Sequence, residues 1–233
     1  MEFSRNLIPG TLVKRYKRFL ADVVLKSGEQ VTAHCPNTGA MTGLKEPGSE
    51  VWLSPAPKTK TRKLKYTWEM IRVEKGLVGI NTLLPNKIVT EAIRSGLIPE
   101  LTGYDNLQNE VKYGESSRID ILLSGPGKPD CYVEIKNVHL VRKPKIAEFP
   151  DSVSARATKH QKELSTIVNK GGRAVTFYLC QREDCEIFRL AQDIDPNYAT
   201  TTANAEKNGV EMLSYDCSLS TSSINLRRRL SIN

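Results

Sequence analysis

The sequence lacks the features that direct a protein into or across a membrane. No segment of the 233 residues approaches the roughly eighteen consecutive apolar residues that a membrane-spanning helix needs. The opening residues, MEFSRNLIPG, contain no basic stretch followed by a hydrophobic core, so no signal peptide is predicted. We therefore expect a cytoplasmic protein that has no membrane partner.

Paired cysteines and histidines at metal-ligand spacing are also missing. The five cysteines are odd in number and none forms a CxxC pair, and the three histidines show no ligand spacing with them. Both observations argue against a structural zinc site. We expect reduced and mostly buried thiols, as in a cytoplasmic protein, at Cys35, Cys131, Cys180, Cys185 and Cys217.

The composition is that of a globular protein, with 39% hydrophobic and 26% charged residues, and the length suits one large domain or two small ones. The net charge of +8 is unevenly distributed along the chain. Residues 1–80 contain fourteen Lys or Arg against seven Asp or Glu, whereas residues 81–233 contain twenty against nineteen. This asymmetry predicts that the N-terminal third meets a polyanion. The alternative is a basic surface that serves only solubility.

The first eighty or so residues read as an all-β unit. A long β-rich run at Gly10–Leu25, with Val, Tyr and Phe among basic residues, is followed by a turn and by shorter β-rich runs between Pro and Gly breaks. Several strands in so short a chain, the first of them long and curled, predict a small OB-type barrel over residues 1–81. The further strands are expected at Gln30–His34, Glu50–Ser54, Tyr66–Val73 and Leu77–Asn81.

Barrels of the OB type commonly hold nucleic acid, with basic groups on phosphates and aromatic rings under bases. No base-reading motif is visible, so binding is expected to depend on the backbone and on salt and to be weakly sequence-specific; DNA is the expected partner, and RNA remains open. The tryptophan has an alternative place in the barrel core. The candidate nucleic-acid-binding residues are Lys14, Arg15, Lys17, Arg18, Arg62, Lys63, Lys65, Tyr66 and Trp68.

Residues 82–217 alternate helical and strand patterns, which predicts an α/β domain with a mixed sheet. A helix is expected at Lys87–Ser95, with Asn86 as N-cap, and a second at Val153–Asn169, capped by Asp151 or Ser152. The segment Arg142–Pro150 is expected to be a loop, and residues 218–233 a basic and partly disordered tail. Other elements are expected at Glu110–Tyr113, Arg173–Cys180, Ile187–Leu190, Pro196–Asn208 and Val210–Asp216.

The stretch Ser117–His139 contains the strongest chemical pattern. Two apolar runs flank a Gly-Pro-Gly-Lys-Pro turn, so a β-hairpin is expected, with Asp120 near Glu134 across it. Because side chains alternate along a strand, Glu134 and Lys136 lie on one face and Ile135 on the other. Two carboxylates and an ammonium on one face predict a site for a hard divalent cation. The alternative is the wet face of an ordinary antiparallel hairpin.

This order of elements resembles the core of the PD-(D/E)xK nuclease fold, with Asp120 as the first motif acid and Glu134-Ile135-Lys136 as the second. The resemblance implies that Asp120 and Glu134 bind Mg²⁺ or Mn²⁺ and that Lys136 orients or activates the attacking water. His160 on the later helix is a further candidate catalytic residue, or else a half-buried histidine of the core. Glu91 on the earlier helix is either another ligand or a solvated helix residue.

Several longer motifs run through most of the chain, and together they resemble the sugar fermentation stimulation protein A family. They are His34–Gly39, Lys65–Glu69, Gly79–Thr82, Ser117–Asp120, Tyr132–Val138, Phe149–Asp151 and Lys159-His160, continued by Ile194–Pro196 and Gly209–Glu211. The resemblance implies an OB-like N-terminal domain, a nuclease-like C-terminal domain and non-specific DNA binding, with a link to regulation of sugar (maltose) metabolism.

Three interpretations of function follow. In the first, which we favour, the protein is a non-specific DNA-binding protein and regulator that retains a metal-dependent nuclease-type site. In the second, it is an active Mg²⁺-dependent nuclease acting on DNA or RNA. In the third, the α/β domain hydrolyses another phosphate ester and the basic barrel is incidental. The sequence indicates no particular oligomeric state.

Overall fold

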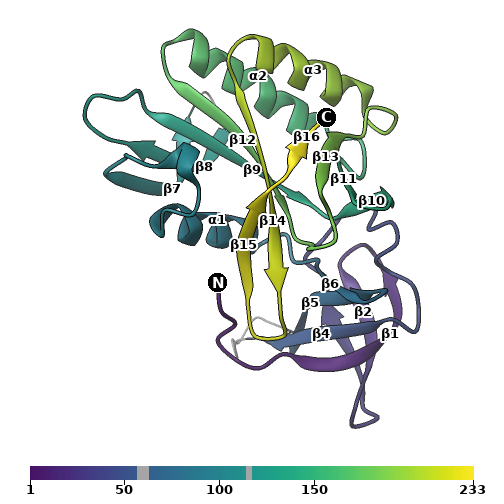
Figure 1. Cartoon of the computed structure of the whole chain (residues 1–233). Helices are drawn as coiled ribbons and strands as arrows, with labels where there is room; N and C mark the ends of the chain where they lie inside the picture. Colours follow the sequence, from purple (N-terminus) through teal and green to yellow (C-terminus); the bar gives the residue numbers. More distant parts are fainter. Residues whose placement is uncertain (57–62, 114–116) are drawn as a thin grey trace.

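The computed structural model of the chain describes residues 1–56, 63–113 and 117–233 (Figure 1). The chain forms a small β-barrel followed by a larger α/β unit, and the barrel lies below the α/β unit in Figure 1. One candidate nucleic-acid-binding residue, Arg62, lies outside the described residues.

The barrel is built from antiparallel strands, and its sheet closes on itself. Its strands follow the order β3-β2-β1-β4-β5-β6, and parallel pairing of Ala33 with Tyr66 joins β3 to β5. Closure removes the unpaired edges of the sheet. The predicted OB-type fold is confirmed. The strands are β1 (Ile8–Tyr16), β2 (Leu20–Leu25), β3 (Gln30–His34), β4 (Glu50–Pro55), β5 (Tyr66–Val73) and β6 (Gly76–Gly79).

The expected single long strand at Gly10–Leu25 is wrong, because the chain reverses within it. Lys17 and Arg18 adopt φ values of 49° and 63°, and β1 and β2 pair as a tight antiparallel hairpin on either side of them. Such turns normally use Asn or Gly, which tolerate positive φ. Two basic residues in these positions do not match any common turn pattern.

The second unit contains a mixed six-stranded sheet of order β15-β14-β12-β9-β8-β7. The strands β7, β8 and β9 pair antiparallel, β9, β12 and β14 pair parallel, and β15 is antiparallel to β14. The mixed sheet of the predicted α/β domain is confirmed. Its strands are β7 (Asn106–Tyr113), β8 (Ser117–Ser124), β9 (Cys131–Val138), β12 (Arg173–Cys180), β14 (Glu211–Leu219) and β15 (Ile224–Arg229).

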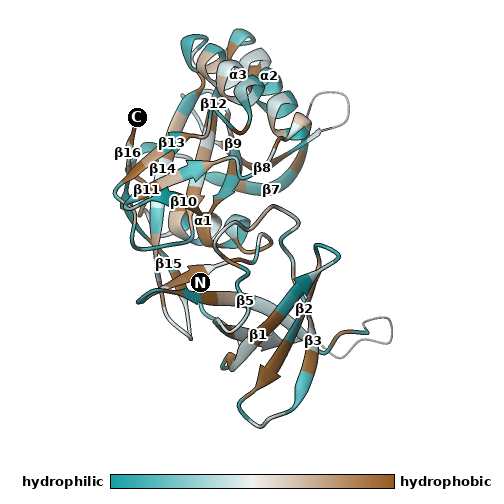
Figure 2. Ribbon diagram, turned by 90° about the vertical axis from the view of Figure 1, so that its right-hand side faces the viewer, coloured by the Kyte–Doolittle hydropathy of each residue, from teal (hydrophilic) through white to brown (hydrophobic). Residues whose placement is uncertain are grey.

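Helices cover both faces of this sheet. On one face, α1 (Pro85–Arg94), followed by the short 3-10 turn Pro99–Leu101, packs Ile88 and Val89 into a core that includes Ile135. On the other face, α2 (Ala155–Asn169) and α3 (Pro196–Lys207) lie side by side, and Leu164 of α2 contributes to a second apolar cluster. Figure 2 shows hydrophobic residues along the central strands between these layers.

The helix ends differ from the sequence expectation. Helix α1 begins at Pro85 with Leu84 as its N-cap, so Asn86 is not a cap and its side chain is available for other contacts. Helix α2 is capped by Ser154, whose hydroxyl accepts a hydrogen bond from the Ala157 amide at 3.2 Å, and not by Asp151 or Ser152. The predicted stop at Gly96 is confirmed by its φ of 70° just after α1.

Two segments expected to be irregular form strands. The lysine- and proline-rich segment Arg142–Pro150 contains most of the hairpin of β10 (Leu140–Lys143) and β11 (Ile146–Phe149). Packing stabilises this hairpin, since its Ala147 is fully buried in a local core. These strands join β13 (Ile187–Leu190) and the C-terminal β16 (Ser231–Ile232) in a four-stranded sheet. The partly disordered tail predicted for residues 218–233 is therefore also wrong, because β15 and β16 lie within it.

The cysteines match the sequence expectation of buried thiols. All five cysteines lie in the described part of the chain, and all are buried and free. Among residues 1–56, 63–113 and 117–233, no helix is long and apolar enough to span a membrane.

Candidate metal and nuclease site

The predicted hairpin forms, and it brings Asp120 to the backbone of the Glu-x-Lys strand. Strands β8 and β9 pair from Ile121–Val133 to Leu123–Cys131. Beyond that point Asp120 Oδ2 accepts a hydrogen bond from the Ile135 amide at 2.7 Å. The carboxylate therefore takes the place of a backbone acceptor where the two strands separate, which holds it beside Glu134.

Glu134 and Lys136 face α2, where they meet His160. Lys136 Nζ donates to Glu134 Oε1 at 2.8 Å, and His160 Nδ1 donates to the same oxygen. The three side chains are almost fully buried, with residue exposures of 3%, 9% and 5%. The ordinary wet hairpin face is therefore wrong for this strand, because α2 covers it.

The pKa values of the two carboxylates are shifted in opposite directions. Burial, and then the nearby Glu134 charge, raise the pKa of Asp120 to about 6, although the Ile135 amide and Asn86 partly offset this. Burial would also raise the pKa of Glu134, but hydrogen bonds and charge from His160 and Lys136 outweigh it and leave that pKa below its ordinary value. A cation between the carboxylates would relieve their mutual repulsion.

One oxygen of this cluster has no partner in the part of the chain that the structure describes. Glu134 Oε2 is buried and accepts no hydrogen bond from any described residue. An unsatisfied buried carboxylate oxygen is costly unless something outside the protein compensates it. Across residues 1–56, 63–113 and 117–233, no group of three His, Cys, Asp or Glu side chains is arranged to hold a metal. Mg²⁺ nevertheless fits, because it is often bound by one or two carboxylates together with water and substrate phosphate.

Two adjoining pockets open beside the carboxylates. The first, of about 530 Å³, is lined by Asn86 and Lys136 among others, and the second, of about 470 Å³, by Arg118 and Lys159. Five residues line both pockets, namely Glu110, Asp120, Glu134, Arg156 and His160. The candidate site is thus open to a ligand although Glu134, Lys136 and His160 are almost fully buried.

Sequence reasoning missed two residues of this site. Asn86 Nδ2 donates to Asp120 Oδ1 at 2.9 Å and to Glu110 Oε1 at 3.0 Å. Glu110 has a φ of 56°, an irregular conformation that aims it toward the pocket from β7. No sequence pattern predicts a role for Glu110. Asn86 follows a proline in the first turn of a predicted helix, and a polar side chain at that position could have been recognised as a candidate site residue.

Glu91, the other acid considered as a ligand, lies elsewhere. Its carboxylate is 2.9 Å from the Met1 ammonium and 3.9 Å from Lys87 Nζ. It lines neither pocket. The acid that approaches the site beside the two predicted ligands is Glu110, from a strand and not from the preceding helix.

The candidate nucleic-acid residues of the barrel separate into groups. Trp68 is fully buried in the barrel core, so its proposed stacking role is wrong. The Arg15 guanidinium donates to the carbonyl oxygens of Asn37 and Gly39 at 2.8 and 3.0 Å, which fixes the loop after β3. Tyr66 is half-buried against the core. The exposed candidates are Lys14, Lys17, Arg18, Lys63 and Lys65.

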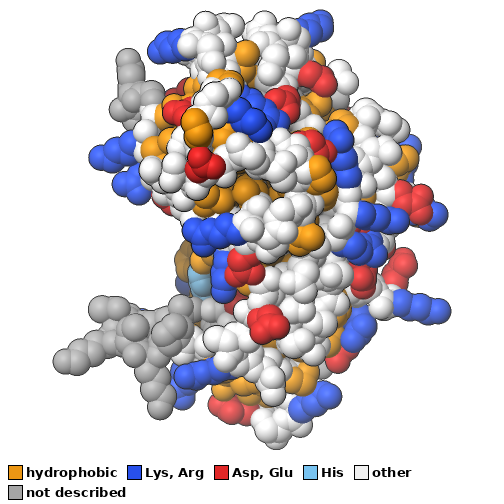
Figure 3. Space-filling model, turned by 60° about the vertical axis from the view of Figure 1, so that its left-hand side comes forward, with side chains coloured by type: hydrophobic (Ala, Val, Ile, Leu, Met, Phe, Trp, Pro, Cys, Tyr) orange, Lys and Arg blue, Asp and Glu red, His pale blue; other side chains and the backbone are white. Residues whose placement is uncertain are grey.

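Charges of both signs are mixed on the face of the molecule in Figure 3. Lys and Arg side chains there alternate with Asp and Glu over both units and do not gather in one basic patch. On this face, attraction of a polyanion would depend on a few local groups.

Several family-like motifs meet where the barrel contacts the α/β unit. Thr82 Oγ1 donates to the Pro36 carbonyl at 2.5 Å, and the Met41 amide donates to Asp151 at 3.3 Å. Gln181 Nε2 donates to Asn137 Oδ1 at 2.6 Å and to the Asn81 carbonyl at 3.2 Å. The Gln181 amide thus links Asn81, at the end of the barrel, to Asn137 of the strand that carries Glu134 and Lys136.

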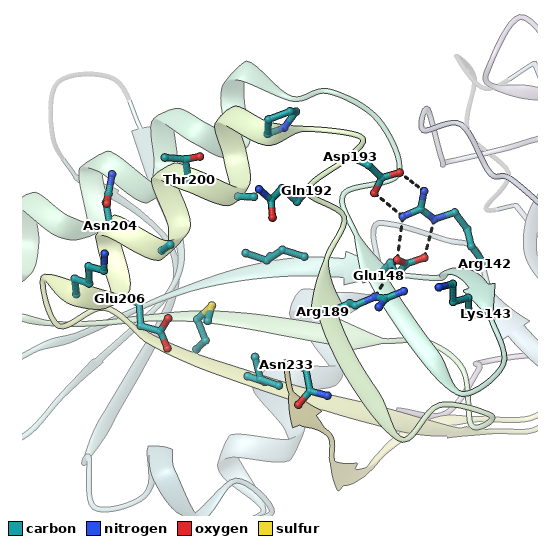
Figure 4. Close-up of a pocket in the computed structure, with 17 residues that line it drawn as sticks. Arg142, Lys143, Glu148, Arg189, Gln192, Asp193, Thr200, Asn204, Glu206 and Asn233 are labelled. Carbon is teal, nitrogen blue, oxygen red and sulfur yellow. Dashed lines mark hydrogen bonds and ion pairs between the residues drawn. The ribbon is translucent and has the colours of Figure 1, made fainter.

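A third and larger pocket, of about 1330 Å³, lies between α3 and the four-stranded sheet (Figure 4). Arg142 joins the buried Glu148 to Asp193 at one end of it, with donor–acceptor distances of 2.5–2.9 Å. Arg189 donates to Glu148 at 3.2 Å. These two arginines are matched by carboxylates, so their charges are already compensated within the protein.

The Glu148 cluster predicts acid sensitivity. Hydrogen bonds from Arg142 lower the pKa of Glu148 below its ordinary value of 4.5, so ionised Glu148 stabilises the fold above that value. This stabilisation is lost as the pH falls through the lowered pKa. We expect Glu148→Gln to reduce the free energy of unfolding by about 1–3 kcal/mol at pH 7, and less as the pH falls below 4.5.

Urea unfolding of both proteins between pH 3 and pH 7 (roughly the range over which carboxylates titrate) measures this difference. Asp193→Asn is the matched control, because Asp193 binds the same arginine but is 66% exposed. It is expected to have the smaller effect. A Glu148→Gln penalty that stays constant over this pH range would contradict the assignment.

A closed OB-type barrel joined to a mixed sheet, in which an Asp on one strand adjoins Glu-x-Lys on the next, defines a two-domain protein with a PD-(D/E)xK nuclease-like domain. Two family models match it: the N-terminal OB domain at residues 13–80 and the sugar fermentation stimulation protein RE domain at residues 83–223. The chain belongs to the sugar fermentation stimulation protein (SfsA) family.

Full-length relatives support this membership. A sugar fermentation stimulation protein homolog from Maricaulis maris is 53% identical over 232 residues, covering 100% of this chain and 98% of the relative. One from Paramagnetospirillum magneticum is 54% identical with the same coverage. The solved structure of Pyrococcus furiosus SfsA in complex with Ca²⁺ matches with a TM-score of 0.89 at 28% identity, covering 100% of this chain and 98% of that one.

Proposed function

We propose that this protein binds nucleic acid and hydrolyses its phosphodiester bonds with a divalent cation held by Asp120 and Glu134. The observation that supports this best is the buried Glu134 Oε2, which has no partner among the described residues and lies in a cluster with Asp120 and Lys136. A platform that only bound nucleic acid would gain nothing from this arrangement, since carboxylates repel phosphates without a cation between them.

Mg²⁺ or Mn²⁺ suits the oxygen donors of this site. The Ca²⁺ complex of Pyrococcus furiosus SfsA supports a site for a hard divalent cation in the family. A cation held here would stabilise the charge that develops on the scissile phosphate and would lower the pKa of a bound water.

The other side chains have distinct parts in this proposal. Lys136 presents its ammonium to the scissile phosphate and orients the attacking water. His160 binds Glu134 Oε1, while Oε2 has no partner among the described residues, so His160 is a positioning residue for the carboxylate. Asn86 holds Asp120 through Oδ1, and the Ile135 amide holds Oδ2.

The barrel is proposed to hold the nucleic acid through its exposed basic residues, with weak sequence preference. These are Lys14, Lys17, Arg18, Lys63 and Lys65. The buried and free cysteines support work in the reducing cytoplasm.

The alternative is a DNA-binding regulator linked to sugar (maltose) metabolism, in which the nuclease-type site is retained without cleavage. The names of the relatives favour this alternative, since they refer to stimulation of sugar fermentation. The two functions differ in whether the site turns over.

Incubation with single- and double-stranded DNA and RNA, in Mg²⁺ or Mn²⁺, separates the two functions. We expect the unaltered protein to cleave at least one substrate, chelation to stop it, and Glu134→Ala to lower the rate by about 10³-fold or more. Glu91→Gln is the matched control, because it removes an acid that lies away from the site.

Absence of cleavage by every protein on every substrate, with nucleic-acid binding intact, would overturn the nuclease proposal and leave the regulator. Equal cleavage by Glu134→Ala and the unaltered protein would show that the activity arises elsewhere.

A further inference from the structure

The two pockets beside the carboxylates differ in charge. We call the second one the basic pocket; apart from residues shared with the first, it is lined by Ser117, Arg118 and Lys159. The first pocket adds apolar and amide side chains and one cation, Lys136, which is already paired with Glu134. The shared Arg156 adds a further positive charge to the basic pocket.

The basic residues come from two elements that face each other across the site. Arg118 precedes Asp120 by two residues on β8, so both side chains lie on the same face of the strand. Arg156 and Lys159 are three residues apart on α2, and His160 follows, so these side chains share one side of the helix. The fold thus places three cations around the basic pocket, of which Arg118 and Lys159 line it alone and Arg156 lines both pockets.

Acids near the basic pocket offset only part of these charges once a cation is bound. Glu110 also lines the basic pocket, but it is exposed and accepts a hydrogen bond from Asn86 at 3.0 Å. Asp120 and Glu134 belong to the metal in the proposed function. Lys159 lies 3.5 Å from Glu163, whose carboxylate also accepts hydrogen bonds from Ser117 at 2.7 Å and Tyr113 at 3.1 Å. An ion pair between a lysine that is 54% exposed and Glu163 contributes little and yields readily to a phosphate.

We infer that the basic pocket is a subsite for the phosphate next to the one that is cleaved. A phosphodiester on the cation at Asp120 and Glu134 would have its neighbour along the strand beside Arg118, Arg156 and Lys159. The substrate would then be a polynucleotide, and an isolated phosphate ester would bind poorly. This inference rests on the proposed function for the scissile phosphate, but the subsite itself can be tested without cleavage.

The first test measures binding of a short single-stranded oligodeoxynucleotide in Ca²⁺ over a range of salt concentrations. The variant Arg118→Ala/Lys159→Ala is compared with Arg94→Ala/Lys162→Ala, which removes one Arg and one Lys that are also exposed but line neither pocket. We expect the subsite variant to bind at least about tenfold more weakly and with a shallower salt dependence, by about 0.7 in slope for each phosphate that is no longer neutralised. The control is expected to match the unaltered protein.

The second test compares substrates in Mg²⁺. Bis(p-nitrophenyl) phosphate has a diester but no neighbouring phosphate, whereas the oligonucleotide has both. We expect the ratio of kcat/KM for the oligonucleotide to that for the small diester to fall by about tenfold or more in the subsite variant.

Equal losses of binding in the subsite and control variants would overturn the subsite, as would a salt slope equal to that of the unaltered protein. An equal loss of kcat/KM on both substrates would also overturn it, because the residues would then act on the scissile phosphate itself. If the unaltered protein cleaves neither substrate, the proposed nuclease function fails and the binding comparison alone decides the subsite.

Discussion

Lys136→Met is expected to slow phosphodiester cleavage by about 10²–10⁴-fold without weakening the binding of a divalent cation. The Lys136 ammonium lies 2.8 Å from Glu134 Oε1, and the residue is only 9% exposed. Methionine fills nearly the same space but has no charge and no proton to donate. Glu134 keeps its hydrogen bond from His160, so the metal-binding carboxylate stays in position.

Two measurements distinguish a catalytic role for Lys136 from a structural one. Cleavage in Mg²⁺ reports turnover, and the rise in melting temperature on adding Ca²⁺ reports cation binding. Removing an ammonium beside the carboxylates should leave Ca²⁺ affinity equal or higher, because like charges repel. Lys128→Met is the control, since Lys128 is exposed in the turn that joins the same two strands.

Two outcomes would contradict a catalytic role for Lys136. Loss of Ca²⁺ binding together with cleavage would mean that Lys136 only holds Glu134 in place. Cleavage at the unaltered rate would remove Lys136 from the mechanism.

The double variant Arg227→Ala/Arg228→Ala is expected to lower the free energy of unfolding by about 3 kcal/mol. Both guanidinium groups donate to Asp216, which is 0% exposed on β14, and Arg228 Nε does so at 3.2 Å. Without them a buried carboxylate loses most of its compensation. The value lies at the low end of the usual range, because the arginines are partly exposed and the Arg228 amide still donates to Asp216 at 3.0 Å.

The neighbouring Arg229 provides the comparison. It pairs with Glu100 at 2.8 Å with its side chain 56% exposed, so Arg229→Ala should cost no more than about 1 kcal/mol. Urea unfolding midpoints of the variants measure both effects. Equal penalties for the double variant and for Arg229→Ala would contradict the assignment of Asp216 as the anchor of β15.

The hairpin at Ser117–His139 was predictable because strand alternation and turn formation depend on residues that are neighbours in the sequence. Alternation along β9 puts Glu134 and Lys136 on one face and Ile135 on the other, and Ile135 does pack in the core with α1. The barrel was predictable for a similar reason, since β-rich runs separated by Gly and Pro indicate short strands. Helix stops at glycine followed the same local logic.

The misjudged segments depended on contacts with distant residues. The hairpin of β10 and β11 has few strand-forming residues, but Ala147 and Phe149 pack against β12, β13 and α3. From the sequence alone, the three consecutive arginines Arg227–Arg229 predict a disordered basic tail. In the structure two of them pair with Asp216, which is buried on another strand. Trp68 is an aromatic residue close to a basic segment, which suggested a stacking surface for bases. In the structure its side chain faces the interior of a closed barrel.

The sequence by itself determined the family, the two-domain order and the acid–acid–lysine pattern, because motif identity and strand alternation depend only on neighbouring residues. The tertiary structure decided what surrounds that pattern. Only folding buries the Glu134 carboxylate under α2 beside His160. Folding also joins Asn86 to Asp120 and Glu110, and it sets Arg118 of β8 opposite Lys159 of α2. These groups are far apart along the chain, and their charges act on one another only once packing brings them close and excludes water.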